Sequence, residues 1–135
     1  MKQEYIDYAK EISVIGDQTQ VAANLFGELS KKKAKSIEEL KAIVEDYKVA
    51  KNGFVKCKEN LEKIAPPKVI IEEHTELVNT YNKLIESVEI HLTALNLNDG
   101  SVDFDLISKG FKLNATAIKE VGEVTDKIVT VFQNN

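Results

Sequence analysis

The sequence contains one cysteine, Cys57, and two histidines among its 135 residues. One cysteine cannot form a disulfide within the chain, and no cluster has the spacing of a structural zinc site. Gly-rich phosphate loops, G-x-S-x-G and H-E-x-x-H are also absent. We therefore expect no metal and no cofactor, and we expect that the protein is not an enzyme.

Long hydrophobic runs and broad basic stretches are missing as well. No run of about 18 apolar residues occurs, so we expect no membrane span. The net charge is −4, and the only basic run is Lys31 to Lys35. Nucleic acid is therefore not an expected partner. The basic run fits the C-terminal end of a helix, where positive charge is favoured, with a binding patch as the alternative.

What the sequence does contain is typical of a soluble globular domain. Hydrophobic residues make up 43% and charged residues 30%, which is too apolar for a disordered chain. A chain of this length can bury a cooperative core without disulfides or metals. We expect one domain, residues 1–135.

The apolar residues recur at helical spacing throughout, and the breaks predict four helices at about 2–33, 37–65, 67–97 and 103–133. Ser36 and Glu39 form a capping box that opens the second helix. Pro66 and Pro67 end it, and Pro67 can begin the third. Asn52 and Gly53 resemble a hairpin turn, but the helical phase runs through them.

Four apolar stripes follow from steps of three and four residues. The first is Tyr5, Tyr8, Ile12, Ile15, Thr19, Ala22, Phe26 and Leu29. The second is Leu40, Ile43, Tyr47, Ala50, Phe54, Cys57, Leu61 and Ile64. The third is Ile71, His74, Val78, Tyr81, Ile85, Val88, Leu92 and Leu95, flanked by Leu77 and Leu84. The fourth is Phe104, Ile107, Phe111, Asn114, Ile118, Val121, Thr125, Ile128 and Phe132.

Long helices joined by short turns are antiparallel neighbours. The predicted fold is therefore all-α, an antiparallel up-down-up-down four-helix bundle. Gly110 and Gly122 fall beside the fourth stripe, where we expect them to let a neighbouring helix approach closely.

The histidines lack the E-x-x-H pattern of di-iron bundles, because Ile71 and Val88 stand three residues before them. The glutamates near His74 suit the start of a helix better than a metal site. His91 is expected at the boundary of the core, with a ligand or pH-sensing role as the alternative.

Counting outward from the proline turn places Cys57 and His74 in one layer of the bundle, with Thr125 at the same level. The three side chains are candidate ligand-binding residues. A Cys–His pair can produce a nucleophilic thiolate. The favoured interpretation, however, is a buried histidine satisfied by Thr125 or a backbone carbonyl, beside a thiol that acts as a small hydrophobe.

The same counting pairs Thr19 with Tyr81 and Asn114 with Tyr47. Such pairs would fix the register of the helices. The alternative is a small polar-lined pocket between helices.

Three segments resemble the small extracytoplasmic four-helix domains of lipoproteins from Gram-positive bacteria: "EYIDYAKEI", "LEKIAPPKVIIEEHTELVNTYNKLI" and "ISKGFKLNATAIKEV". The shared features are an I-x-x-P turn at Ile64 to Pro67, a histidine at His74, and an I-x-x-G step from Ile107 to Gly110. The resemblance implies a signal peptide, a lipid-bearing cysteine and a tether. Residues 1–10 contain neither a hydrophobic signal core nor a lipobox, so these segments are expected in a longer precursor.

These observations lead to one main hypothesis and one alternative. The main hypothesis is a non-enzymatic, extracytoplasmic domain, monomeric or weakly dimeric, that binds a protein or an envelope component and reaches the membrane only through its lipid anchor. The alternative is a small-molecule sensor or carrier with a pocket near Cys57, His74 and Thr125. An enzyme that uses the Cys–His layer comes third, and a cytoplasmic location is the alternative to the envelope.

Overall fold

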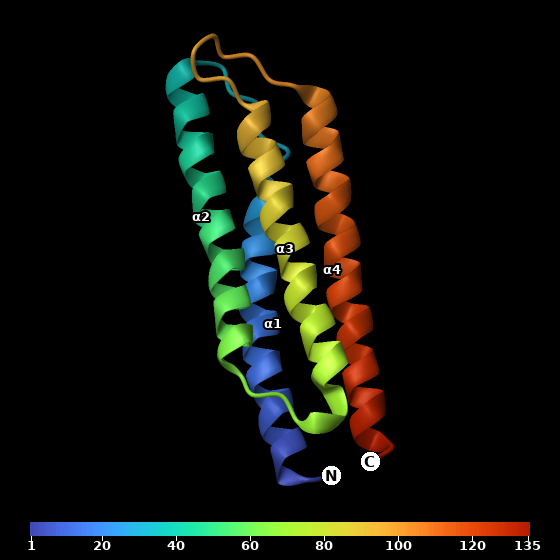
Figure 1. Ribbon diagram of the computed structural model, residues 1–135. Helices are drawn as coiled ribbons and strands as arrows, with labels where there is room; N and C mark the ends of the chain where they lie inside the picture. The colour runs from blue at the N-terminus through green and yellow to red at the C-terminus, as the bar shows by residue number, and fades with distance from the viewer.

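The computed structural model describes all 135 residues, and it shows an all-α four-helix bundle without β-strands (Figure 1). Consecutive helices run in opposite directions, and both termini lie at the same end, as the sequence predicted. The elements are α1 (Gln3–Leu29), α2 (Ile37–Lys63), the short 3-10 helix η1 (Lys68–Ile70), α3 (Ile71–Ala94) and α4 (Phe104–Gln133).

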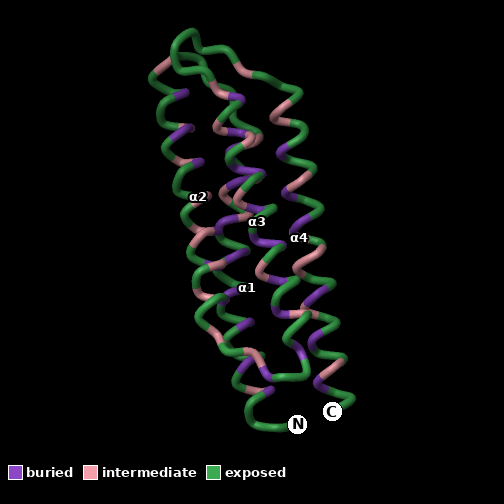
Figure 2. Tube along the Cα trace, viewed as in Figure 1, coloured by how far each residue is buried: buried purple, intermediate pink, exposed green.

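Each helix turns a stripe of buried residues toward the bundle axis (Figure 2). All eight residues of the predicted first stripe, from Tyr5 to Leu29, are buried. Near the termini, the ring of Tyr5 stacks on that of Phe132 with centroids 4.4 Å apart, which joins α1 to α4. The heptad spacing of α1 is thus sufficient to predict which of its faces is buried.

Helix α1 ends at Leu29, four residues before the predicted end. The backbone amide and the hydroxyl of Ser30 both donate to the carbonyl of Phe26, at 3.0 and 2.8 Å. The next two amides, of Lys31 and Lys32, bond to the carbonyls of Glu28 and Leu29, three residues earlier and not four, so the α-helical pattern ends here. Lys31, Lys32 and Lys33 therefore lie in the loop and not in the last turn of a helix.

Helix α2 starts where the capping box predicts, because Ser36 Oγ accepts a hydrogen bond from the Glu39 amide at 3.1 Å. Its helical geometry continues through Asn52 and Gly53 to Lys63, as predicted. Pro67 begins no α-helix. It precedes η1, and α3 starts only at Ile71, four residues later than predicted.

The α3–α4 connection is a tight loop. Helix α3 ends at Ala94, and Leu95 and Val102 form an isolated antiparallel bridge. Gly100 adopts a positive φ of 75° there, a conformation that glycine takes without steric cost. Asp103 then caps α4 by accepting hydrogen bonds from the amides of Asp105 and Leu106.

Helices α3 and α4 pack most closely, because Gly110 and Ala117 on α4 have little or no side chain. The predicted close approach of a neighbouring helix at Gly110 is confirmed, because α3 lies directly against it. The same prediction for Gly122 was wrong, because Gly122 faces open space. The fourth stripe was also partly wrong. Phe104 is 74% exposed and Phe111 47%, since α4 turns its small residues toward α3.

This rotation leaves α1 and α4 as the neighbouring pair of helices with the fewest close contacts. None of the helices combines the length and the hydropathy that crossing a membrane requires.

Candidate functional site

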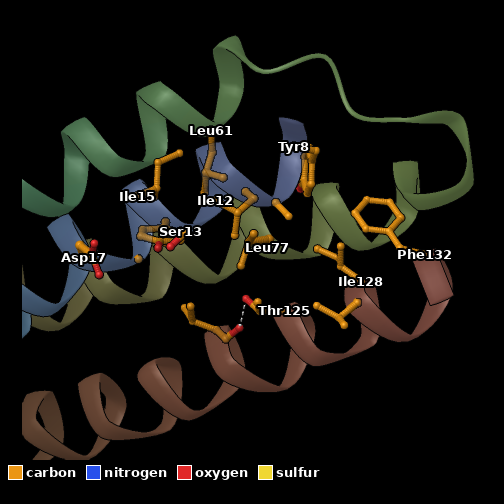
Figure 3. Close-up of a pocket in the computed structure, with 15 residues that line it drawn as sticks. Tyr8, Ile12, Ser13, Ile15, Asp17, Leu61, Leu77, Thr125, Ile128 and Phe132 are labelled. Atoms are coloured by element: carbon orange, nitrogen blue, oxygen red, sulfur yellow. Dashed lines mark hydrogen bonds between the residues drawn. The ribbon is translucent and has the colours of Figure 1, made fainter. Parts of the chain in front are cut away.

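A pocket of about 350 Å³ lies between α1 and α4, in the half of the bundle that contains the termini (Figure 3). We call it the α1–α4 pocket. Eleven of its fifteen lining residues are hydrophobic. The lining consists of Tyr8, Ala9, Ile12, Ser13, Ile15, Gly16, Asp17, Leu61, Leu77, Tyr81, Val121, Thr125, Ile128, Val129 and Phe132.

The pocket exists because α1 presents small residues to α4. Ala9, Ser13 and Gly16 recur at steps of four and three, which places them on one face of the helix. A Cβ atom added to Gly16 would meet nothing within 4 Å. Val121 and Thr125 on α4 are too short to fill the space. The resulting hollow is therefore present without any movement of the helices.

Of the three predicted site residues, only Thr125 lines this pocket. Its hydroxyl donates to the Val121 carbonyl at 2.7 Å, one turn earlier in α4. Figure 3 shows it opposite Ser13 and Ile12 of α1. The hydroxyl oxygen can still accept a hydrogen bond from a bound molecule.

Cys57 is completely buried behind the pocket. Its Sγ lies 3.5 Å from Thr19 Oγ1, and the thiol faces the Ile15 carbonyl at 3.9 Å. Burial raises the pKa of the Cys57 thiol, and the nearby Thr19 hydroxyl only partly offsets this. The thiol is therefore protonated at neutral pH, which is the opposite of what a nucleophile needs.

His74 is also buried, and its partner is Tyr8. The Tyr8 hydroxyl and His74 Nδ1 are 2.8 Å apart. Burial lowers the pKa of His74, and a backbone interaction with Leu61 partly offsets this. The imidazole is therefore favoured in its neutral form.

No hydrogen bond links any two of Cys57, His74 and Thr125. The Cys–His pair that the sequence left open does not form, and the expected pairing of His74 with Thr125 is wrong. The expectation that the histidine and the thiol are both buried is confirmed. The count assumed a turn centred on Pro66. The additional residues of η1 change the level at which α3 meets α2.

Two tyrosines connect the predicted residues to the pocket. Tyr8 lines the pocket and contacts His74 behind it, and Tyr81 lines the pocket and contacts Thr19, which contacts Cys57. The pairing of Thr19 with Tyr81, at 2.6 Å, was predicted and is confirmed. The sequence prediction missed both tyrosines as pocket residues. The small-residue stripe of Ala9, Ser13 and Gly16 is the signal that could have located the pocket.

The hydrogen atoms in this network can be assigned. Thr19 carries one hydroxyl hydrogen, and the short 2.7 Å contact with the Ile15 carbonyl uses it. Tyr81 therefore donates to Thr19. Burial raises the pKa of Tyr81 to about 12 and raises the pKa of Tyr8 above that of Tyr81. Both hydroxyl groups are therefore neutral at neutral pH. Asp17, exposed at the rim, is the only charged residue of the lining.

A second histidine–tyrosine pair lies in the other half of the bundle. His91 is fully buried, and its prediction as a boundary residue was wrong. Its Nε2 lies 2.8 Å from the Ile107 carbonyl, so Nε2 carries the proton and Nδ1 accepts from Tyr47 at 3.0 Å. Tyr47 is thus not paired with Asn114, which donates instead to Ser87 at 3.0 Å.

No group of three or more His, Cys, Asp or Glu side chains is positioned to hold a metal ion. Every buried side-chain nitrogen or oxygen atom has a hydrogen-bond partner within the protein. The buried polar groups around the α1–α4 pocket are therefore already satisfied, and binding there would rely mainly on apolar contact.

We found no protein-family model, no curated protein and no solved structure that matches this chain. The resemblance to lipoprotein domains therefore stays a prediction.

Proposed function

We propose that this protein is a non-enzymatic binding domain that holds a small, mainly apolar molecule in the α1–α4 pocket. The observation that carries the proposal is the pocket itself. It is preformed, its volume of about 350 Å³ falls in the range of small-molecule sites, and its walls are largely apolar.

The chemistry of the lining indicates the kind of molecule. Ile12, Leu77 and Ile128 offer aliphatic surface, and the ring of Phe132 offers an aromatic wall (Figure 3). The hydroxyl groups of Ser13 and Thr125 can each contact one polar group of the ligand. The expected ligand is therefore an uncharged molecule with a branched or cyclic apolar body and one or two hydrogen-bonding atoms.

The positions of Cys57 and His74 support a binding role over catalysis. The thiol is protonated, the imidazole is hydrogen-bonded to the Tyr8 hydroxyl, and neither side chain lines the pocket. A nucleophile and its base must both reach the substrate. These two residues act as supports for the pocket wall.

Binding can be tested with N-phenylnaphthylamine, a neutral apolar fluorophore. We expect saturable fluorescence enhancement with the wild-type protein. Gly16→Leu should abolish it, because the new side chain enters the pocket. Gly27→Leu is the matched control, since Gly27 is also on α1, also faces open space and does not line the pocket.

Two results would overturn the proposal. One is equal fluorophore binding by Gly16→Leu and Gly27→Leu, with circular dichroism showing both variants folded. The other is the absence of saturable wild-type binding for the fluorophore and for a panel of uncharged apolar metabolites, followed as shifts in melting temperature.

We further propose that the protein works outside the cytoplasm on a lipid anchor and that its ligand is an envelope component. The support is the sequence resemblance, carried by the proline turn, His74 and the step from Ile107 to Gly110. The genomic sequence upstream of Met1 tests it. A signal peptide ending in a lipobox supports the location, and an untranslated region without one, together with recovery from the cytoplasmic fraction, refutes it.

A further inference from the structure

The α1–α2 and α3–α4 loops lie at the end of the bundle opposite the termini (Figure 1). Residues of both loops line a second pocket there. We call it the loop-end pocket. Its volume is about 330 Å³, and nine of its fourteen lining residues are hydrophobic. Leu40 and Ile43 of α2 and Leu95 and Val102 of the α3–α4 connection form its apolar walls. It shares no residue with the α1–α4 pocket.

The charge at this pocket is of one sign. Lys31, Lys32 and Lys33 line it, and no carboxylate does. None of the three lysines makes a salt bridge, although the protein as a whole carries a net charge of −4. Three cations without counter-ions at the mouth of an apolar hollow form a strong local attraction for an anion.

The acidic residues of the neighbouring loop are engaged elsewhere. Asp99 accepts a hydrogen bond from the Ser101 amide at 2.9 Å, and Asp103 caps α4 through two amides at 3.1 Å. Both carboxylates thus serve the backbone of the loop and do not pair with the lysines.

The position of the lysines follows from the early end of α1. After Ser30 the α-helical pattern ends, because the amides of Lys31 and Lys32 bond to the carbonyls of Glu28 and Leu29, three residues earlier. The chain then turns across the end of the bundle. Had α1 continued to residue 33, the three lysines would have pointed in three directions around the helix, since successive residues are about 100° apart.

We propose that the loop-end pocket binds a free amphiphilic anion. An aliphatic chain or ring packs against Leu40, Ile43 and Leu95, and a carboxylate or phosphate group contacts Lys31 to Lys33. The ring of Phe104 is 74% exposed at the rim of the pocket. It covers the aliphatic part of the ligand where that part leaves the pocket. A volume of about 330 Å³ suits one chain of moderate length, so the ligand is a monomer and not a bilayer.

The proposal does not depend on the α1–α4 pocket, and the experiment separates the two. Binding of decanoate is measured by calorimetry and compared with that of decanol, which has the same chain without the charge. We expect decanoate to bind at least about tenfold more tightly and its affinity to fall with added salt.

Two variants of equal charge locate the site. Lys31→Gln/Lys32→Gln/Lys33→Gln should weaken decanoate binding by about tenfold or more. Lys56→Gln/Lys58→Gln/Lys63→Gln removes the same charge from α2, from lysines that make no salt bridge and line neither pocket, and should leave the affinity within about twofold. Phe104→Ser should weaken binding without affecting the fold, because Phe104 is exposed.

Several outcomes would overturn the proposal. Equal affinity for decanoate and decanol shows that charge plays no part. If both triple variants lose the same amount of decanoate affinity, decanoate is attracted only by the net charge of the protein and not by Lys31 to Lys33. Loss of decanoate binding in Gly16→Leu places the ligand in the α1–α4 pocket. Binding to phosphatidylglycerol vesicles but not to monomeric decanoate identifies a membrane surface as the partner.

Discussion

His91 of α3 lies directly against Gly110 of α4, so closely that a Cβ atom on the glycine would come within 2.7 Å of the imidazole Nε2. The same atom would lie 2.9 Å from the Ser87 carbonyl. The imidazole is held in this place by the Tyr47 hydroxyl and the Ile107 carbonyl. Any side chain at position 110 must therefore displace either the histidine or the backbone of α3.

Gly110→Ala should destabilise the protein by about 1–3 kcal/mol, the usual cost of overpacking a core. Gly122→Ala is the matched control. It lies on the same helix, faces open space, and should stabilise by up to about 1 kcal/mol because alanine favours the helix. Urea unfolding measures both. Similar stability for the two variants would show that α3 and α4 are not held this closely.

The contact between Gly110 and His91 also explains which parts of the fold the sequence predicts. The α1 stripe was correct in full because large apolar residues recur there at regular spacing. The α4 stripe was assigned to its large residues, including Phe104 and Phe111, which are exposed. A prediction from hydrophobic periodicity identifies the buried face of a helix by the spacing of its large apolar side chains. Such a prediction ignores a glycine, although the missing side chain of Gly110 decides which face of α4 is turned toward α3.

The candidate site shows the same limit. The pairing of Thr19 with Tyr81 was predicted from the buried stripes of α1 and α3, on which both residues lie. The α1–α4 pocket was not, because it arises where α4 turns away from α1 and where small residues leave space. The predicted layer of Cys57, His74 and Thr125 failed for a related reason, since the count did not include the 3-10 turn η1.

Acidification should destabilise the bundle between pH 7 and pH 5. Burial lowers the pKa of both His74 and His91 from the ordinary value of 6.5. The unfolded chain therefore binds more protons than the folded one in this window. The stabilisation is complete above pH 6.5 and is lost as the pH falls through the folded pKa values. Each histidine contributes a slope of at most about 1.4 kcal/mol per pH unit.

Urea unfolding at intervals of half a pH unit measures this slope. The window ends at about pH 5 because most carboxylates titrate below it. Salt at constant ionic strength keeps surface charge effects equal. Constant or rising stability on acidification would contradict the buried, neutral state of the two imidazoles.

The pair of Tyr8 and His74 should show strong coupling. His74→Leu removes the partner of the buried Tyr8 hydroxyl, 2.8 Å away, and should cost about 1–3 kcal/mol. Adding Tyr8→Phe removes the unpaired hydroxyl as well and should recover most of that loss. The double variant should also retain only the part of the pH dependence that belongs to His91. A double-mutant cycle by urea unfolding measures the coupling. Additive effects would show that the hydroxyl and the imidazole do not interact.

Cys57 should resist alkylation for as long as the protein is folded. The side chain has no exposed surface, so the reagent cannot reach it. Burial also raises the pKa of its thiol, so little of the reactive thiolate is present. Iodoacetamide labelling, followed by mass spectrometry, should be at least about a thousandfold slower in buffer than in urea, because only the rare unfolded molecules react. Cys57→Ser/Val49→Cys is the control, because Val49 is on the same helix and 59% exposed, so its cysteine should label rapidly in both conditions. Rapid labelling of native Cys57 would contradict its place in the core and would restore a reactive thiol as a candidate for chemistry.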